Sequence, residues 1–493
     1  MYRKSLMKKK GTIFILILAL LLTAGCGLAD DSEKATDAAD ATTVARETGA
    51  AADEKDAEAT TDANATDITT EELSAEEDTT WSAGSVLDGD DESEQTPAPE
   101  GWEMVEGFSD VGDAAYLYNA SAADGDGRCT VAETEDRVYI CGNSYIYMYD
   151  KETEAAPQIL CSRPDCRHTD AEECPAYAGI GVNSTIQYYE GNLYTLLYRQ
   201  AYDGEGEDAA VVYKIDLYQV AEDGSGRTYV QTLVEMDKGS ATGDGNSGSF
   251  YARFIINSGY VYYWYDIRGL SETDTYANGS NCLYRVKLGE NTGEECVAPC
   301  ASSLRSYGEY IYFLWTPPYE TYWSMALYRV CPVEKRVEYL TDLEISSAFT
   351  ISDGEIYYWD SWDDENETWP IYLAKVYDIA TGEDTVLCDF SQSDYTIGSS
   401  ILTDGDYWYV WGKEEGAEEY SWHVYDMECN LLGVITQPEL PDNVGTLTSW
   451  ELEITEERVY LTINTQQNIG AYYEKDGFAE GDFTVHMTGM YKE

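Results

Sequence analysis

The stretch Tyr310-Ile311-Tyr312-Phe313-Leu314-Trp315 decides the fold, because β-branched and aromatic residues occupy both of its alternating faces. Such strands are expected in a sheet that is covered on both sides. The opening phrase recurs seven times, and its copies end at Tyr139, Tyr194, Tyr262, Tyr312, Tyr357, Trp408 and Tyr460. Successive copies lie 45 to 68 residues apart, close to the ~40 to 50 residues of one propeller blade. We therefore predict an all-β fold, a β-propeller of seven blades of four antiparallel strands, with six or eight blades as alternatives.

A second phrase follows the first at a variable distance, for example Leu283-Tyr284-Arg285-Val286 and Leu327-Tyr328-Arg329-Val330. Its register predicts the third strand of each blade. Turn pairs such as Asp353-Gly354 precede the first phrase and predict a hairpin corner there. The segment from Ala114 to Tyr118 could add a strand to the last blade and close the ring, since an open ring would expose sheet edges.

Residues 1–25 have the pattern of a bacterial export signal. A basic segment precedes the apolar run from Ile13 to Leu22, which is shorter than the ~20 residues of a membrane-spanning helix. The next residues, Leu22-Thr23-Ala24-Gly25-Cys26, resemble the lipobox of bacterial lipoproteins. That resemblance implies that Cys26 becomes the lipidated N-terminus and anchors the chain at the extracellular face of the cell membrane. The alternative is an ordinary secretory signal that happens to end near Cys26.

Residues 26–106 are expected to form a disordered acidic linker, and residues 107–493 the propeller. Between residues 27 and 100 there are 23 acidic and 3 basic residues, and Trp81 is the first aromatic one. Such a segment cannot bury enough apolar surface to offset the entropy of ordering, and its like charges repel. It is either a stalk that lifts the propeller off the membrane or a linker without a length requirement.

The charge of the chain restricts its partners. The formal net charge is −63, of which −48 remains when the signal and linker are left out. Nucleic acid binding is not expected, because it requires clustered Lys and Arg. The negative electrostatic field favours cations, basic peptides or cationic surface material as partners. The alternative is that the charge only keeps an exported protein soluble.

The repeat phrases, as in Ile356-Tyr357-Tyr358, Leu283-Tyr284-Arg285-Val286 and Asp223-Gly224-Ser225-Gly226, resemble those of TolB-like and low-density-lipoprotein-receptor-like propellers of uncharacterised bacterial lipoproteins. The resemblance covers roughly residues 107–493. It implies a propeller that acts as a surface or secreted binding module.

The sharpest chemical motif is a run of three cysteines and one histidine, namely Cys161, Cys166, His168 and Cys174. Cys₃His is a ligand set of structural zinc sites. In an exported protein the alternative is a disulfide, either within this set or with Cys129 or Cys141. A third interpretation is that these cysteines are plain buried thiols. Related lipoprotein propellers carry similar Cys-Pro-Asp-Cys-x-His phrases, which implies a local structural staple. Cys296 and Cys300 form a second close pair with the same ambiguity.

Aromatic and acidic residues in two inter-strand loops are candidates for ligand binding, by stacking and by cation–π attraction. The alternative is that these aromatic side chains wedge between blades. Calcium is conceivable at the acids, although the spacing of a calcium loop is missing. The candidates are Trp315, Tyr319, Trp323, Trp359, Asp360, Trp362, Asp363, Asp364 and Trp369.

These observations predict a binding or scaffolding module for a peptide, a glycan or a partner protein rather than an enzyme. The alternative is a surface carbohydrate-active enzyme, a glycosidase or lyase, with two carboxylates in the propeller channel. No sialidase-type Asp-box, G-x-S-x-G, H-E-x-x-H or Walker motif occurs, and these are the patterns by which other hydrolases are recognised.

Overall fold

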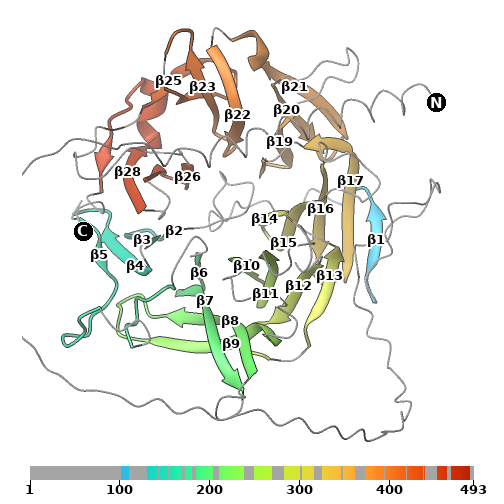
Figure 1. The fold of residues 1–493 in the computed structure, drawn as a ribbon. Coiled ribbons are helices and arrows are strands. Elements are labelled where there is room, and N and C mark those ends of the chain that lie inside the picture. Colours follow the sequence, from blue (N-terminus) through green and yellow to red (C-terminus); the bar gives the residue numbers. More distant parts are fainter. Residues whose placement is uncertain are drawn as a thin grey trace, which may run out of the picture. The chain divides into compact units, whose positions relative to one another are not determined.

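Each of the seven aromatic phrases forms the second strand of its own four-stranded antiparallel unit in a computed structural model of the chain (Figure 1). The structure describes residues 101–109, 130–142, 144–153, 156–168, 173–179, 185–203, 210–237, 249–268, 282–291, 293–299, 302–315, 325–332, 334–345, 348–360, 372–393, 395–417, 419–436, 438, 452–463 and 468–488. The predicted all-β, seven-bladed propeller is confirmed.

The blades follow one another along the chain, and each is a continuous segment. Blades 1 to 3 consist of β2 (Val131–Glu133), β3 (Arg137–Gly142), β4 (Tyr145–Asp150) and β5 (Gln158–Ile159); β6 (Ile186–Tyr189), β7 (Asn192–Asp203), β8 (Ala210–Val220) and β9 (Arg227–Asp237); and β10 (Ser249–Asn257), β11 (Tyr260–Arg268), β12 (Cys282–Lys287) and β13 (Glu295–Pro299). Blades 4 and 5 consist of β14 (Ser302–Tyr307), β15 (Tyr310–Trp315), β16 (Met325–Cys331) and β17 (Arg336–Ile345); and β18 (Phe349–Ser352), β19 (Glu355–Asp360), β20 (Leu373–Asp378) and β21 (Glu383–Asp389). Blades 6 and 7 consist of β22 (Tyr395–Thr403), β23 (Tyr407–Glu414), β24 (Ser421–Asp426) and β25 (Leu431–Ile435); and β26 (Leu452–Ile454), β27 (Arg458–Ile463), β28 (Asn468–Glu474) and β29 (His486–Met487). Two short 3-10 helices, η1 (Phe390–Gln392) and η2 (Lys475–Glu480), complete the described elements.

The predicted hairpin corners and third strands are also confirmed. The second phrase lies in the third strand, as in β12 and β16. At the corner before β19, Asp353 and Gly354 have φ values of 52° and 83°. A two-residue hairpin turn needs a positive φ at both central residues, and glycine adopts such a conformation without steric cost. The X-Gly pairs therefore set the register of the first two strands.

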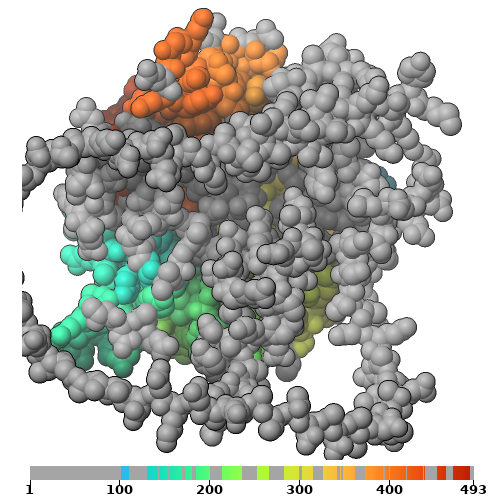
Figure 2. Space-filling model, in the orientation of Figure 1, coloured from blue at the N-terminus to red at the C-terminus, as the bar shows by residue number. Residues whose placement is uncertain are grey.

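The core is divided among the interfaces between neighbouring blades. The described residues form seven clusters of buried apolar side chains, one for each interface of the ring. Each blade is thus covered on both faces, which explains why its strands are apolar on both alternating faces. In the space-filling view, the surface of blades 1 and 2 (cyan to green) and the orange surface around β22 lie at different sides of the ring (Figure 2).

At the seam that closes the ring, the described residues of blade 7 and blade 1 share no strand. All four strands of blade 7 come from the C-terminal part of the chain, and the segment from Ala114 to Tyr118 lies outside the described residues. Instead, Arg458 donates to the hydroxyl of Tyr149 (3.1 Å), which lies 3.2 Å from the hydroxyl of Tyr460. Tyr460 in turn donates to the carboxylate of Glu133. Burial raises the pKa of Tyr460 well above its ordinary value, so this chain of hydrogen bonds stays protonated.

A fifth strand, β1 (Glu103–Glu106), lies on the outer edge of blade 4, where it pairs in parallel with β17. The side chain of Trp102 is buried in the cluster between blades 3 and 4. Ordered structure therefore begins before residue 107, at which the sequence places the start of the propeller.

Two disulfides are present among the described residues. Cys282 and Cys296 join β12 to β13 within blade 3. Cys388 on β21 and Cys429, in the turn between β24 and β25, join blade 5 to blade 6. The pairing of Cys296 with Cys300 suggested by their spacing is therefore wrong, because the neighbouring antiparallel strand brings Cys282 to Cys296; Cys300 itself lies outside the described residues.

Among the described residues, no helix has the length and apolar character needed to cross a bilayer.

The closure between blades 7 and 1 yields a prediction. We expect Tyr460→Phe to lower the free energy of unfolding by roughly 1 to 3 kcal/mol, because it breaks a buried hydrogen-bond chain and leaves Glu133 with Lys151 but without its tyrosine donor. Urea unfolding followed by circular dichroism measures this. The control is Tyr260→Phe, whose hydroxyl makes no hydrogen bond with the described residues. Equal effects of the two substitutions would contradict the role of this seam.

Candidate metal centre

The cysteine and histidine motif lies in the connection between blade 1 and blade 2, directly after β5. The chain turns sharply there, since the amide of Cys161 donates to the carbonyl of Ile159 (2.7 Å) and the amide of Cys166 to that of Arg163 (3.2 Å). His168 has a φ of 55°, in the left-handed region. These turns point residues of one short segment toward a common centre.

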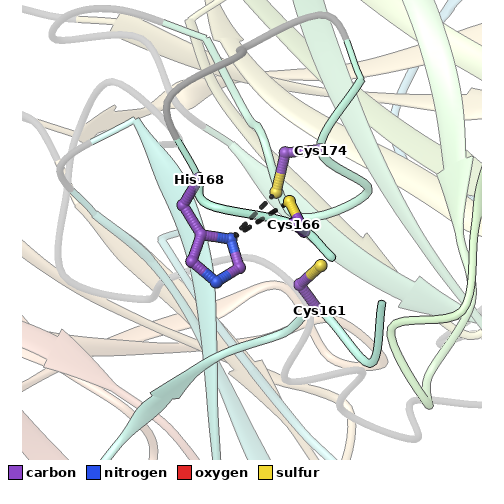
Figure 3. Close-up of side chains that lie close together, drawn as sticks. All are labelled: Cys161, Cys166, His168 and Cys174. Carbon is purple, nitrogen blue, oxygen red and sulfur yellow. Dashed lines mark hydrogen bonds between the residues drawn. The ribbon is translucent and has the colours of Figure 1, made fainter. Parts of the chain in front are cut away.

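Figure 3 shows the side chains of Cys161, Cys166, His168 and Cys174 facing one another. Their ligand atoms all lie within 4.8 Å of one another. The Nδ1 atom of His168 is 3.5 Å from the Sγ of Cys166 and 3.4 Å from that of Cys174. Tetrahedral zinc with Zn–N of about 2.05 Å and Zn–S of about 2.3 Å requires N···S separations of about 3.6 Å. The four residues could therefore hold a metal ion with little rearrangement.

Backbone contacts tie this group to both blades. The amide of Leu160 donates to Ile146 on β4 (2.8 Å), and the amide of Ser162 donates to Gly224 in the turn between β8 and β9 (3.0 Å). The hydroxyl of Tyr145 donates to the carbonyl of His168. A ligand held by the four side chains would thus fasten blade 1 to blade 2.

The protonation of the thiols differs with their surroundings. A hydrogen bond from the backbone of His168, aided by Cys161 and Cys174, lowers the pKa of Cys166. Burial raises the pKa of Cys174 to about 12. Metals bind the thiolate, so binding here must release a proton from Cys174 and is favoured at higher pH.

No disulfide joins Cys161, Cys166 or Cys174. Of the other proposed disulfide partners, Cys141 lies buried on β3, and Cys129 lies outside the described residues.

The structure places two of the candidate ligand-binding side chains in the interior. Trp359 is buried between blades 5 and 6 and stacks on Tyr372 at a centroid distance of 6.1 Å. Asp360 is buried and pairs with Lys375 at 2.9 Å. Trp315 ends β15. The remaining candidates lie outside the described residues: Tyr319, Trp323, Trp362, Asp363, Asp364 and Trp369. In the described part of the chain, the only cluster with metal-ligand geometry is the cysteine and histidine group.

Sequence reasoning missed two features that the structure shows. The disulfide between Cys388 and Cys429 joins residues 41 positions apart, and nothing in their spacing reveals the contact. Arg285 and Arg329 hold the N-terminal segment through Trp102 and Phe108. The repeated Leu-Tyr-Arg-Val phrase was a signal for these two arginines, because a charged residue recurs there within an apolar strand.

Comparison with known proteins adds no family. No family model matches the chain, and no curated protein matches it. Among solved structures, the chain is similar to a prolyl endopeptidase, with 11% identity over 75% of this chain and 50% of that chain and a TM-score of 0.41. It is also similar to an oligogalacturonate lyase in complex with manganese, with 10% identity over 62% of this chain and 84% of that chain and a TM-score of 0.32. A third similar structure is the GH74 xyloglucanase from Xanthomonas campestris, with 10% identity over 71% of this chain and 54% of that chain and a TM-score of 0.34. The chain spans half the length of the prolyl endopeptidase. Likenesses this remote carry no argument about function.

The turn beside the centre gives a second prediction. A Cβ on Gly224 would lie 2.7 Å from the backbone of Leu160 and 2.8 Å from that of Cys161, at a φ of +68°. We expect Gly224→Ala to destabilise the fold by roughly 2 kcal/mol or more and to weaken metal retention. The control is Gly226→Ala, because a Cβ there meets nothing within 4 Å. Thermal unfolding and metal analysis of both variants check this, and equal behaviour would contradict the close approach.

Proposed function

We propose that this chain is a lipid-anchored β-propeller at the extracellular face of the cell membrane, where it binds or scaffolds a peptide, a glycan or a partner protein. The observation that carries the choice of a binding module over a hydrolase is the state of the buried carboxylates. Five carboxylates are buried among the described residues, and each is bound by another side chain. Four form ion pairs, Asp216 with Arg199, Glu338 with Arg329, Asp360 with Lys375 and Asp404 with Lys475, and Glu453 accepts a hydrogen bond from Thr130.

A glycosidase needs a carboxylic acid that stays protonated, with a raised pKa. Glu338 shows the opposite. Burial alone would raise its pKa, but hydrogen bonds from Ser109 and the guanidinium of Arg329 outweigh burial and lower the pKa. The carboxylates of Asp216, Asp360 and Asp404 are likewise engaged in ion pairs, with Arg199, Lys375 and Lys475, that support the blades.

We also propose that Cys161, Cys166, His168 and Cys174 bind a structural zinc ion. Three thiolates and one imidazole match the preference of zinc for soft ligands, and four protein ligands close the site to substrate. The ion would stabilise the connection between blades 1 and 2. Calcium at the acidic loop gains no support, because Asp360 is engaged by Lys375.

Lipid attachment at Cys26 and the acidic stalk lie outside the described residues. The support for them is the sequence pattern alone. The net charge of −63 is the basis for proposing that nucleic acid is not a partner.

Zinc binding is tested by metal analysis. Protein purified under reducing conditions should contain about one zinc per chain, and Cys174→Ser should contain roughly none, because removal of one thiolate opens a four-ligand site. Chelation should lower the melting temperature of the wild type but not that of Cys174→Ser. Cys331→Ser is the control, since Cys331 is a buried thiol on β16. A metal-free wild-type protein with intact thiols would rule out the zinc centre.

Lipid anchoring is tested in cells. Cys26→Ala should release the protein into the medium, because no acyl chains then hold it in the bilayer. A control, Ser82→Ala in the linker, should leave it membrane-bound. Retention of the Cys26→Ala protein in the membrane fraction would contradict anchoring at this residue.

The released protein then tests binding against catalysis. We expect it to bind purified cell envelopes and to leave their glycans and peptides unchanged, as followed by co-sedimentation and mass spectrometry. New reducing ends or peptide fragments would show that the module is an enzyme instead.

A further inference from the structure

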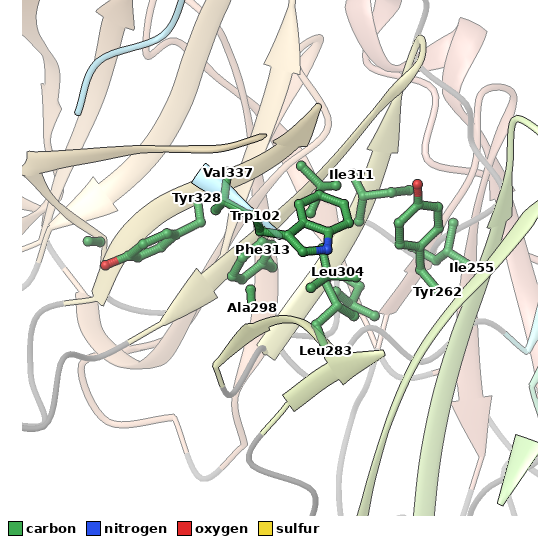
Figure 4. Packing of buried hydrophobic residues seen from close by; sticks show 13 residues of the cluster. Trp102, Ile255, Tyr262, Leu283, Ala298, Leu304, Ile311, Phe313, Tyr328 and Val337 are labelled. Carbon is green, nitrogen blue, oxygen red and sulfur yellow. The ribbon is translucent and has the colours of Figure 1, made fainter. Parts of the chain in front are cut away.

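Residues 101–109, here called the strap, wrap the outer edge of blade 4 and insert one aromatic ring on each side of it. Trp102 enters the cluster between blades 3 and 4, among Ile255, Leu283 and Ile311 (Figure 4). Phe108 packs against the cluster between blades 4 and 5. Between them, β1 pairs with β17 in parallel.

Each ring of the strap covers an arginine. The guanidinium of Arg285 lies 4.5 Å from the centre of the Trp102 ring, and that of Arg329 lies 4.3 Å from the centre of the Phe108 ring. Each guanidinium also contacts the first tyrosine of the aromatic phrase in its own blade. The distance to the ring centre is 4.7 Å from Arg285 to Tyr260 and 4.3 Å from Arg329 to Tyr310. Such cation–π contacts are strongest where water is excluded.

The two arginines occupy the same position of the repeat. Arg285 pairs with Tyr262, and Arg329 pairs with Tyr312, the last residues of two equivalent phrases. The other five blades have no basic residue there, and they carry Met148, Gln219, Val376, Tyr425 and Tyr472. Only neighbouring blades 3 and 4 can therefore hold two aromatic rings in this way, which explains where the strap lies.

Both guanidinium groups are fixed by acids that do not belong to the strap. Arg285 is held by Glu295 at 2.8 Å, and Arg329 is held by Glu338 at 2.6 Å. The two cationic faces would therefore keep their positions if the strap were to leave. A preorganised site of this kind loses little free energy on ordering when a ligand binds.

The edge of β17 supplies the backbone part of the site. The amide of Glu103 donates to the carbonyl of Lys335 (3.1 Å), and that of Gly107 donates to Tyr339 (2.8 Å). The amide of Ser109 donates to the carboxylate of Glu338 (3.0 Å). Addition of an extended segment to a sheet edge, with side-chain pockets that give specificity, is a general mode of peptide recognition.

We propose that the outer edge of blade 4, with Arg285 and Arg329, is a docking site for an extended peptide whose two aromatic residues are six positions apart, and that the strap is its intramolecular occupant. A partner polypeptide with this pattern would bind by replacing the strap. The proposal gives the binding role proposed above one ligand class, and it depends on neither the lipid anchor nor the zinc ion.

The test uses the full chain with Trp102→Ala and Phe108→Ala, which empties the two ring positions. The probe is a fluorescent peptide of residues 100–110, and fluorescence anisotropy measures its binding. We expect the double variant to bind it at least about tenfold more tightly than the wild type, whose strap competes at an effective concentration of roughly millimolar. Addition of Arg329→Gln, or a peptide in which Trp102 is replaced by Ala, should weaken binding by about tenfold or more.

Two results would overturn the proposal: no binding by a double variant that is folded by circular dichroism, or equal binding by the double variant with and without Arg329→Gln. If the double variant does not fold, hydrogen exchange of the wild type decides. We expect the amides of Glu103 and Gly107 to exchange at least about tenfold faster than those of β15, through local opening of the edge. Exchange only with global unfolding would make the strap a permanent part of the fold. Neither result changes the zinc content or the release of Cys26→Ala, so the proposals fail separately.

Discussion

Closure of the ring between blades 7 and 1 is the contact on which the other six interfaces depend. Every blade is stable only when both of its faces are covered, and an open ring would leave one apolar face of each terminal blade in water. Here the described residues hold the seam by the buried cluster around Val138 and Tyr460 and by hydrogen bonds that run from Arg458 to Glu133 and from Thr130 to Glu453. The fold is therefore cooperative around the ring, although the four antiparallel strands of each blade follow one another in the sequence.

The sequence predicted the blades because strand order within each of them follows chain order. A phrase such as Tyr310-Ile311-Tyr312 reports burial on both faces, and a pair such as Asp353-Gly354 reports a turn with positive φ. Neither signal contains information about contacts between blades. For that reason the parallel pairing of β1 with β17 and the disulfide between Cys388 and Cys429 could not be predicted.

The candidate metal centre could be predicted as a group because its four residues lie within one short segment. Whether they would converge was open, since the spacing fits several turns; the contact of Gly224 with Leu160 and Cys161, from another blade, helps to fix the geometry. For the aromatic candidates, in contrast, the sequence did not predict where the side chains lie. Trp359 is a residue type that often binds ligands, but here the neighbouring blade covers its ring. A single sequence does not distinguish a ring that packs between sheets from one that contacts a ligand.

Among the described residues blade 7 shares no strand with blade 1, and the four strands of each blade lie in one continuous segment of the chain. Duplication or deletion of one such segment would change the circumference of the ring without leaving a half-built sheet at the junction. Only the few side chains at the seam, Tyr149 and Tyr460 among them, would need to find new partners. Recombination can therefore resize this architecture in whole steps, and the same property makes it a tractable scaffold for circular permutation at the gap between blades 7 and 1.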